Sequence, residues 1–503
     1  MSNNNLVLGV VFIPFFTAII GLLFSQTERD RTQRYISLMG SALTCAVSLF
    51  LLTQVLTDGP QVYRMGGFEP PFGIILVADN LSALFSVMAS TVLMMGVLYA
   101  VNCQDKCLTY PAFMPLFLFM EVGLNGALLT GDLFTFFVFM ELMVLSSVSL
   151  VAISDDRYGP EAAMKYIFIS GMGTLFLLLG IAAMYATFGT LNLADMGEQL
   201  ATGQRPLLAR SAAIMLIAAF LLKSAVFPFH FWQPDFHTTA PTPLSAMLSS
   251  VVVKVGIYGI LRLVTLLFAE EAQQIEQLLV ILGVIGIFFG SLSALQTYNG
   301  KRMLAYSTIG QVGFILVCIG WGTPLALAAA IIYSFNHAFI KSALLMLMGV
   351  VASRLKPKSA DFRYINGIGY KLPWIIGALW FMGGMALSGL PPMNGFISKL
   401  AVAQSGVDDS QWLPLFLVIG SGVLTLIYMF RTWQNVFQTK AEPDEIRVEF
   451  KKKGDSPLAP ALLLLICLFL GLYARPLVDI ANATVAQLSD PSIYIGVVGL
   501  FGG

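Results

Sequence analysis

The chain has 503 residues and a formal net charge of zero, and its composition is that of a membrane protein. Hydrophobic residues make up 57% of it and charged residues only 11%, with a mean hydropathy of +0.80. Soluble domains carry about 25% charged residues, so the composition excludes a soluble protein, and the zero net charge implies no polyanionic partner such as a nucleic acid. No region is long and polar enough to form a soluble domain, so we expect one integral membrane domain over residues 1–503.

Apolar segments of about 20 residues, the length that crosses a bilayer, recur along the chain and predict an all-α polytopic fold with about fourteen transmembrane helices. The N-terminal segment MSNNNLVLGVVFIPFF lacks the basic region of a signal peptide, so we expect it to form the first retained helix. The predicted spans lie at 5–24, 35–57, 75–101, 110–129, 133–153, 163–186, 209–230, 248–268, 275–297, 303–320, 324–350, 373–390, 411–434 and 457–474. Short extra helices are expected near 241–247 and 394–405, and the final apolar piece, IYIGVVGLFGG, is too short to cross.

The distribution of basic residues predicts an even number of spans. Loops after odd-numbered spans carry nineteen lysines and arginines. The other face carries only Arg64, Arg205, Arg210, Arg262 and Arg475. Because cytoplasmic loops hold the excess of lysine and arginine, we expect a multi-pass protein of the cell membrane with both termini on the outer face.

Four lysines are predicted to lie inside spans or beside helix breaks, at Lys223, Lys254, Lys341 and Lys399. A charged side chain at mid-bilayer costs several kcal/mol, and four lysines in such apolar surroundings cannot all reach the membrane surface. A single lysine could form an ion pair with a buried acid that only stabilises the fold, but the acids within the spans are too few to pair all four lysines. We therefore expect these lysines to act in transport.

The acids within the predicted spans differ in their surroundings. Glu141 is the strongest candidate for a buried acid, because apolar residues extend about two turns on each side of it. Glu121 also lies mid-span, and the sequence indicates no partner for it. Asp132 follows LLTG in a tight turn and Asp79 lies near the start of the third span, so both are predicted to be helix caps or loop residues.

One buried acid and several buried lysines predict a proton relay. Burial disfavours a charged lysine and a nearby carboxylate favours it, so a moving carboxylate switches the lysine between holding and releasing a proton. His337 precedes Lys341 by four residues and shares its helix face, and histidine titrates near neutral pH. His230 and His237 lie just after Lys223, in VFPFHFWQPDFHTTAPTPLSA. Each histidine is also explicable as a satisfied polar core residue, and that alternative stays open.

Prolines predict two broken helices. Pro228 and Pro234 interrupt the seventh span just after the first of the four lysines, and Pro391 and Pro392 interrupt the twelfth just before the last. Broken helices at matching places in two halves are typical of ion sites in transporters, and these breaks lie five helices apart. They predict two five-helix repeats, spans 4–8 and 9–13. The expected parts of the domain are 1–108 (the first three helices), 109–268 (first repeat), 269–434 (second repeat) and 435–503 (a cytoplasmic loop, the last helix and a tail).

Five motifs between about residues 70 and 405 resemble the antiporter-like subunits shared by respiratory complex I and Mrp-type multisubunit sodium/proton antiporters. The motifs are LLTGDLFTFFVFMELM, KSAVFPFHFWQPDFHTTAPTPLSAMLSSVVVKVGIYGILR, NGKRMLAYSTIGQVGF, NHAFIKSALLMLMG and LSGLPPMNGFISK. The resemblance implies fourteen helices, two inverted five-helix repeats and broken helices seven and twelve. It maps the essential pair onto Glu141 and Lys223, the central relay onto Lys254, His337 and Lys341, and the exit lysine onto Lys399.

Within that group, the segment MGGFEPPFGIILVADNLSALFSVM resembles the A-type and D-type subunits of Mrp antiporters. The chain is too short for the A type, and lysine at the exit position Lys399 is more similar to the D type than to the complex I subunit of similar length. The sequence departs from many relatives at WQP, where they have WLP, and at Asn299, where they have aspartate. HTTAPTP is common in complex I and membrane-hydrogenase relatives too, so the choice of assembly stays open.

The sequence therefore predicts a proton-translocating subunit of an Mrp-type cation/proton antiporter, a transporter component that works with other membrane subunits. It carries no cofactor motif, and Cys103 and Cys107 are interpreted as incidental reduced thiols rather than a metal site. We expect the chain to move protons while a partner handles sodium, because its acids are few. The alternatives are a subunit of a complex I-like or hydrogenase assembly, an inert membrane scaffold, and a stand-alone transporter.

Overall fold

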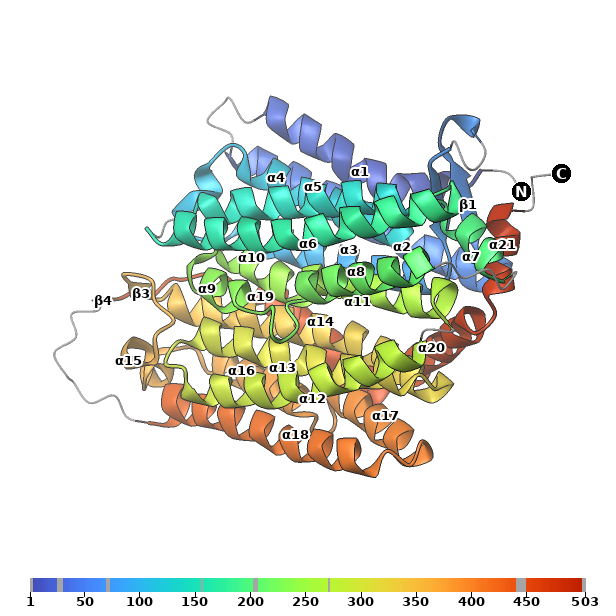
Figure 1. The fold of residues 1–503 in the computed structure, drawn as a ribbon. Helices are drawn as coiled ribbons and strands as arrows, with labels where there is room; N and C mark the ends of the chain where they lie inside the picture. Colours follow the sequence, from blue (N-terminus) through green and yellow to red (C-terminus); the bar gives the residue numbers. More distant parts are fainter. Residues whose placement is uncertain are drawn as a thin grey trace.

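The computed structural model describes residues 3–24, 30–68, 73–154, 157–201, 207–269, 272–439 and 449–499. Long helices lie side by side with their axes roughly aligned (Figure 1). Arg29, Arg205, Lys440 and Arg447, which contribute to the predicted charge asymmetry, lie outside these ranges. Helices satisfy their own backbone hydrogen bonds, which a bilayer requires of any lipid-exposed segment.

The helices and strands have the following bounds. The α-helices are α1 (Asn5–Leu23), α2 (Asp30–Asp58), α3 (Asn80–Val101), α4 (Phe113–Leu129), α5 (Leu133–Ala152), α6 (Gly159–Phe188), α7 (Leu193–Ala201), α8 (Leu207–Lys223), α9 (Trp232–Thr239), α10 (Thr242–Met247), α11 (Val253–Arg262), α12 (Ala272–Gln296), α13 (Gly300–Trp321), α14 (Pro324–Ala352), α15 (Phe362–Ile365), α16 (Trp374–Ser388), α17 (Asn394–Asp408), α18 (Trp412–Trp433), α19 (Leu458–Leu472), α20 (Arg475–Leu488) and α21 (Pro491–Gly499). The strands are β1 (Gln61–Arg64), β2 (Ile75–Ala78), β3 (Leu355–Lys356) and β4 (Glu449–Phe450).

The mostly helical, polytopic fold is confirmed. Within the described ranges, ten helices are long and apolar enough to cross a membrane, or eleven if the bent pair α19–α20 counts as one span. The other predicted spans correspond to the shorter helices α4, α8 and α16. Fourteen crossings therefore stays a prediction.

The structure differs from the predicted elements in a few places. Residues 75–78 form strand β2, which pairs antiparallel with β1, so the third helix begins only at Asn80 and the protein is not purely α-helical. The short helix predicted near 241–247 is present as α10, but it continues through the π-helical residues Leu248–Val252 into α11. A separate short helix, α9, precedes it and was not predicted. Helix α20, bent by 78° from α19, was not predicted.

Burial separates inner from outer helices. Every residue in the most apolar 18-residue stretch of α14 is buried, and so are 94% of the residues in the corresponding stretch of Thr242–Leu267. In α1, α6 and α18 only 33% of the residues in that stretch are buried. The outward faces of these helices carry large apolar side chains such as Phe16, Phe168 and Phe416. Helix α14 therefore forms the centre of the bundle (Figure 1), and the outer helices face lipid or other subunits.

The two ends of the bundle differ in charge. The loops after α3, α5, α12 and α14 meet around one hollow of about 1400 Å³, and we call this end of the molecule the basic end. The hollow is lined by the basic residues Lys106, Arg157, Lys165, Lys301, Arg302, Lys356, Lys358 and Lys451 and by the acidic residues Asp105, Glu161 and Asp235. At the opposite end, Arg64, the last residue of β1, donates a hydrogen bond to the Val498 carbonyl of α21 at 3.4 Å. The Asn3 side chain donates to the Arg64 carbonyl at 3.3 Å, so both described ends of the chain lie together there.

A buried ion pair joins helices at the end opposite the basic end. Asp79 caps α3 by accepting from the Ser82 backbone N–H at 2.9 Å, as the sequence predicted. Its carboxylate also binds Arg262 of α11 through two hydrogen bonds of 2.6 and 2.9 Å, a partner the sequence did not indicate. The guanidinium lies 4.9 Å from the Tyr494 ring centroid, so the pair joins α3, α11 and α21. Asp132 likewise caps α5, at 2.7 Å from the Thr135 backbone nitrogen.

Candidate functional site

The seventh predicted span breaks directly after Lys223. Helix α8 ends at that residue, Ala225 adopts a left-handed backbone conformation with φ of 52°, and regular helix resumes only at Trp232. Pro228 lies inside this break, as predicted. Pro234 does not break a helix, because it occupies the first turn of α9, where no intrahelical N–H is needed.

The twelfth predicted span is broken in a comparable way. Helix α16 ends at Ser388, Pro391 and Pro392 occupy the break, and α17 begins at Asn394. The predicted short helix near 394–405 is therefore confirmed. Lys399 lies in the second turn of α17 and turns back to donate to the Ser388 carbonyl at 2.9 Å, so it binds the backbone that the break exposes.

The ammonium group of Lys223 is held by three oxygen atoms. It lies 3.0 Å from Glu141 Oε1, 2.7 Å from Ser170 Oγ and 3.1 Å from Thr174 Oγ1. A lysine ammonium has three donors, so this group is fully satisfied. Thr174 also donates to Glu141 Oε1 at 2.5 Å, and the side chains from α5, α6 and α8 form one cluster.

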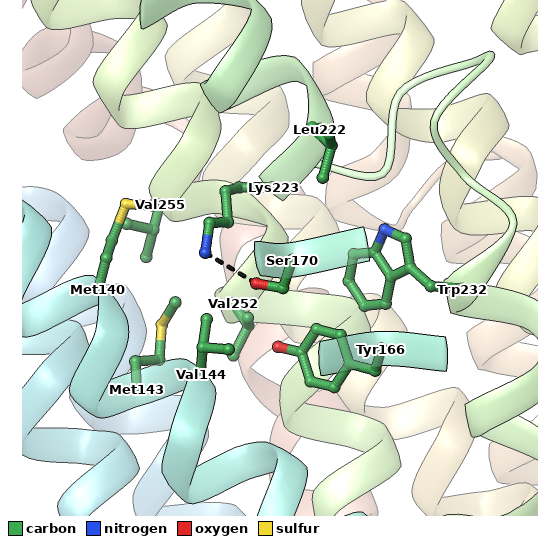
Figure 2. A pocket seen from close by; sticks show the side chains of 10 residues that line it. All are labelled: Met140, Met143, Val144, Tyr166, Ser170, Leu222, Lys223, Trp232, Val252 and Val255. Atoms are coloured by element: carbon green, nitrogen blue, oxygen red, sulfur yellow. Dashed lines mark hydrogen bonds between the residues drawn. The ribbon is translucent and has the colours of Figure 1, made fainter. Parts of the chain in front are cut away.

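Glu141 and Lys223 differ in exposure. The Lys223 side chain is 5% exposed and that of Glu141 is 24% exposed. Lys223 points into a small cavity of about 10 Å³ beside Ser170 (Figure 2), close to the room that one water molecule needs. The lysine of the pair is thus more deeply buried within the chain than the acid.

A second cluster surrounds Lys254 in the centre of the bundle. Lys254 Nζ lies 2.8 Å from His337 Nδ1 and 3.3 Å from the Ser249 carbonyl oxygen. That carbonyl belongs to the π-helical turn, and such turns are frequent at functional sites. The Ser249 hydroxyl in turn lies 2.5 Å from Thr308 Oγ1 of α13, which connects α10–α11, α13 and α14.

Lys341 and the nearby histidines carry polar atoms with no hydrogen-bond partner within the described ranges. These atoms are Lys341 Nζ, His337 Nε2 and His237 Nε2, and all three residues are buried. His237 is anchored through Nδ1, 2.7 Å from Ser245 Oγ. Buried polar atoms are normally satisfied by protein or ordered water, so these three atoms have unused hydrogen-bonding capacity.

Polar side chains that the sequence reasoning missed continue from this cluster toward α18. Tyr333 donates to Gln311 Oε1 at 2.5 Å, and Gln311 reaches Thr425 at 3.5 Å. The hydroxyls of Ser307 and Tyr428 lie 2.8 Å apart. In the sequence, this network is indicated by three polar residues, Ser307, Thr308 and Gln311, that lie close together in one otherwise apolar span.

Not every predicted site residue joins these clusters. The cavity beside Lys223 is lined largely by apolar side chains, including Met140, Val252 and Val255 (Figure 2), and Lys254 is not among its lining residues. His230 packs against the Phe289 ring, with centroids 4.4 Å apart, rather than against Lys223.

Two further predicted groups lie apart from the row of lysines. Glu121 pairs with Ser41 of α2 and shares no partner with the lysines. Cys103 and Cys107 are buried and unbridged.

Buried lysines beside broken helices define a class of membrane transport protein. Residues 130–425 match the family described as NADH:quinone oxidoreductase/Mrp antiporter, transmembrane, and the chain belongs to that family. It is 31% identical over 493 residues to the D subunit of the Na(+)/H(+) antiporter of Alkalihalophilus pseudofirmus, covering 98% of this chain and 99% of the relative. It is also 31% identical over 434 residues to the N subunit of the NADH-quinone oxidoreductase of Desulforudis audaxviator, covering 85% of each chain.

The fold has a solved counterpart. A chain in the structure of the Mrp complex from Dietzia sp. DQ12-45-1b superposes with a TM-score of 0.90 at 24% identity, covering 98% of this chain and 99% of that one. At this identity the likeness concerns the fold alone.

Proposed function

We propose that the chain is the proton-translocating, D-type subunit of an Mrp-type multisubunit Na⁺/H⁺ antiporter. Protons enter from one face and pass Glu141, Lys223, Lys254, His337, Lys341 and Lys399 in turn, with water filling the gaps. The observation that carries the proposal is the Lys223 ammonium held at 3.0 Å from Glu141 beside a helix break. A buried lysine with one movable carboxylate can hold or release its proton as that carboxylate moves.

The transport function requires hydration of the apolar space between the Lys223 cluster and the Lys254 cluster. In the state observed, the cavity beside Lys223 is lined largely by apolar side chains and has room for about one water. We propose that the break after α8 and the π-helical turn before α11 open this space during turnover. Alternation between dry and wet states would keep the proton from leaking freely across the membrane.

The proposed topology follows the same reasoning. Fourteen spans, with α4–α11 and α12–α18 as inverted repeats, place one broken helix, α8–α9 or α16–α17, in each repeat. The basic end faces the cytoplasm by the positive-inside rule, which puts both termini outside. The loop and final helices from 435 onward complete the domain after these repeats.

The Mrp assignment is supported by the share of the chain that aligns with the antiporter relative as much as by sequence identity. The antiporter relative aligns over 98% of the chain, whereas the NADH-quinone oxidoreductase relative, at the same identity, aligns over 85%. The proposed partners are the other membrane subunits of the antiporter. Neighbouring genes separate the alternatives: genes for quinone- and iron–sulfur subunits support a redox-driven assembly, and genes for small hydrophobic Mrp subunits support the antiporter.

We propose that sodium is carried by a partner subunit. Sodium prefers several clustered oxygen ligands, whereas the intramembrane acids of this chain are dispersed. Asp79 is engaged by Arg262 and Glu141 by Lys223, and among the residues that the structure describes Glu121 is engaged only by Ser41. Sodium flux that is lost on mutating only these acids, with proton flux intact, would contradict this assignment.

The test uses the assembled complex in proteoliposomes. Lys223→Ala and Glu141→Ala should each abolish sodium-dependent proton flux, measured with an internal pH dye. Arg475→Ala is the matched control, because Arg475 is 84% exposed and pairs only with Asp479 on the surface of α20. If both site variants transport as well as the control does, the chain is a scaffold and the proposal fails.

A further inference from the structure

A carboxyl group that the lysine row does not use lies buried among the N-terminal helices. Glu121, on α4, has no exposed surface. Its two carboxylate oxygens lie 3.0 and 3.3 Å from the single hydroxyl of Ser41 on α2. Within the described ranges the carboxylate forms no ion pair, in contrast to Glu141 and Asp79. A charged carboxylate in this place would have one neutral donor and would cost several kcal/mol.

Ser41 belongs to a row of hydroxyls on one face of α2, which we call the α2 seam: Ser37, Ser41, Thr44 and Ser48. The spacings of four, three and four residues keep all of them on one helix face, and none has exposed surface. Ser37, Thr44 and Ser48 donate to carbonyls of their own helix at 2.9 to 3.0 Å. Ser41 alone turns its hydroxyl to a side chain of another helix.

The α2 seam begins at the basic end and stops partway along the helix. Gln33, one turn before Ser37, donates to the carbonyls of Gly21 and Pro111 at 3.1 and 2.8 Å. Beyond Ser48 the buried positions of α2 become Leu51 and Val55, which join the apolar core. The row of buried hydroxyls on α2 therefore leads from the basic end past Ser41, the partner of Glu121, and ends in apolar packing after Ser48.

The groups packed around α4 leave Glu121 isolated in charge. Helix α1 carries no titratable side chain. The thiol of Cys45, on α2, is the titratable group next to Glu121, and it lies 3.4 Å from Thr91 Oγ1. The titratable and charged groups of the other elements packed on α4 either have a partner of their own or lie at the basic end. Tyr99 is bound to Asp455, Glu141 to Lys223, Lys254 to His337, Tyr258 to the Leu128 carbonyl and Arg262 to Asp79, and Lys106 and Cys107 lie at the basic end.

We propose that Glu121 is a second proton-binding site, separate from the lysine row and reached along the α2 seam from the basic end only. A neutral amide would hold Ser41 as well as this carboxyl group does, without the cost of burying an ionisable group. Three oxygen atoms are too few for a sodium site, whereas one proton neutralises the carboxylate. Because the seam ends in apolar packing, the site exchanges protons with one face and does not conduct across the membrane.

The test measures carbodiimide labelling of the assembled complex in native vesicles. Dicyclohexylcarbodiimide reacts with protonated carboxyl groups in apolar surroundings, and mass spectrometry of the Glu121 peptide reads the yield. We expect labelling at Glu121 but not at Glu198, which is exposed on α7. Above its midpoint the rate should fall about tenfold per pH unit, and it should follow the pH on the basic-end side only.

Variants and ions separate this proposal from its rivals. Ser41→Ala removes the one donor to the carboxylate that the described residues supply, so labelling should persist to higher pH. Glu141→Gln should leave Glu121 labelling unchanged, which keeps the result independent of the transport pathway. Absence of Glu121 labelling at every pH, equal response to the pH of both faces, or slowing by sodium chloride relative to choline chloride would each overturn the proposal.

Discussion

The hydroxyl of Thr174 provides the sharpest test of the buried pair, because the sequence did not indicate it and a single atom exchange removes it. Thr174→Val keeps the shape of the side chain and deletes its hydrogen bonds to Glu141 Oε1 at 2.5 Å and Lys223 Nζ at 3.1 Å. Hydrogen bonds to charged groups contribute about 1.5–3 kcal/mol each. Since Lys223 keeps its bonds to Glu141 and Ser170, neither charge is left unpaired, and we expect a net cost of about 2 kcal/mol.

If the proton step requires this geometry, that cost corresponds to a rate reduction of up to about thirtyfold. The assay is the initial rate of sodium-driven proton flux in proteoliposomes holding equal amounts of complex. Thr187→Val is the matched control on the same helix, because its hydroxyl donates only to the Ala183 carbonyl at 2.7 Å. Equal rates for Thr174→Val and Thr187→Val would refute the idea that the cluster around Lys223 sets the transport rate.

Three further changes test packing and charge through the melting temperature of the purified complex. Asp79→Asn leaves a buried arginine unpaired and should cost about 3–5 kcal/mol; an unchanged melting temperature would contradict the buried pair. Gly123→Ala puts a methyl group 2.5 Å from the Met143 backbone nitrogen and should cost about 1–3 kcal/mol, whereas Gly171→Ala meets nothing within 4 Å and should be neutral or stabilising. Burial raises the pKa of the Asp105 carboxyl, but the neighbouring lysines Lys358 and Lys301 together lower it by a larger amount. The net pKa therefore lies below its usual value. Its stabilisation is then present above about pH 4 and lost as the pH falls through the folded-state pKa; Asp105→Asn should melt lower than wild type at pH 7, with the gap closing in acid.

The polar connections around the lysines were the part of the site that the sequence could not supply. Single polar residues in apolar spans are ambiguous, because the same serine or threonine can bond its own helix or a neighbouring one. Ser170 and Thr174 lie on α6, and only the packing of α5, α6 and α8 brings both to Lys223. Conversely, the sequence placed His230 near Lys223, and packing put it against aromatic rings instead.

The sequence by itself determined the membrane class, the order of helices, the breaks that follow α8 and α16 and the residues that are costly to bury. These follow from local properties: apolar length, proline, and charged side chains within apolar segments. Tertiary structure alone decided which further groups meet, including Ser170 and Thr174 with Lys223, Asp79 with Arg262, and Glu121 with Ser41. The physical reason is that helix partners are chosen by packing across long sequence separations, and a hydropathy pattern fixes which residues are buried without fixing what they are buried against.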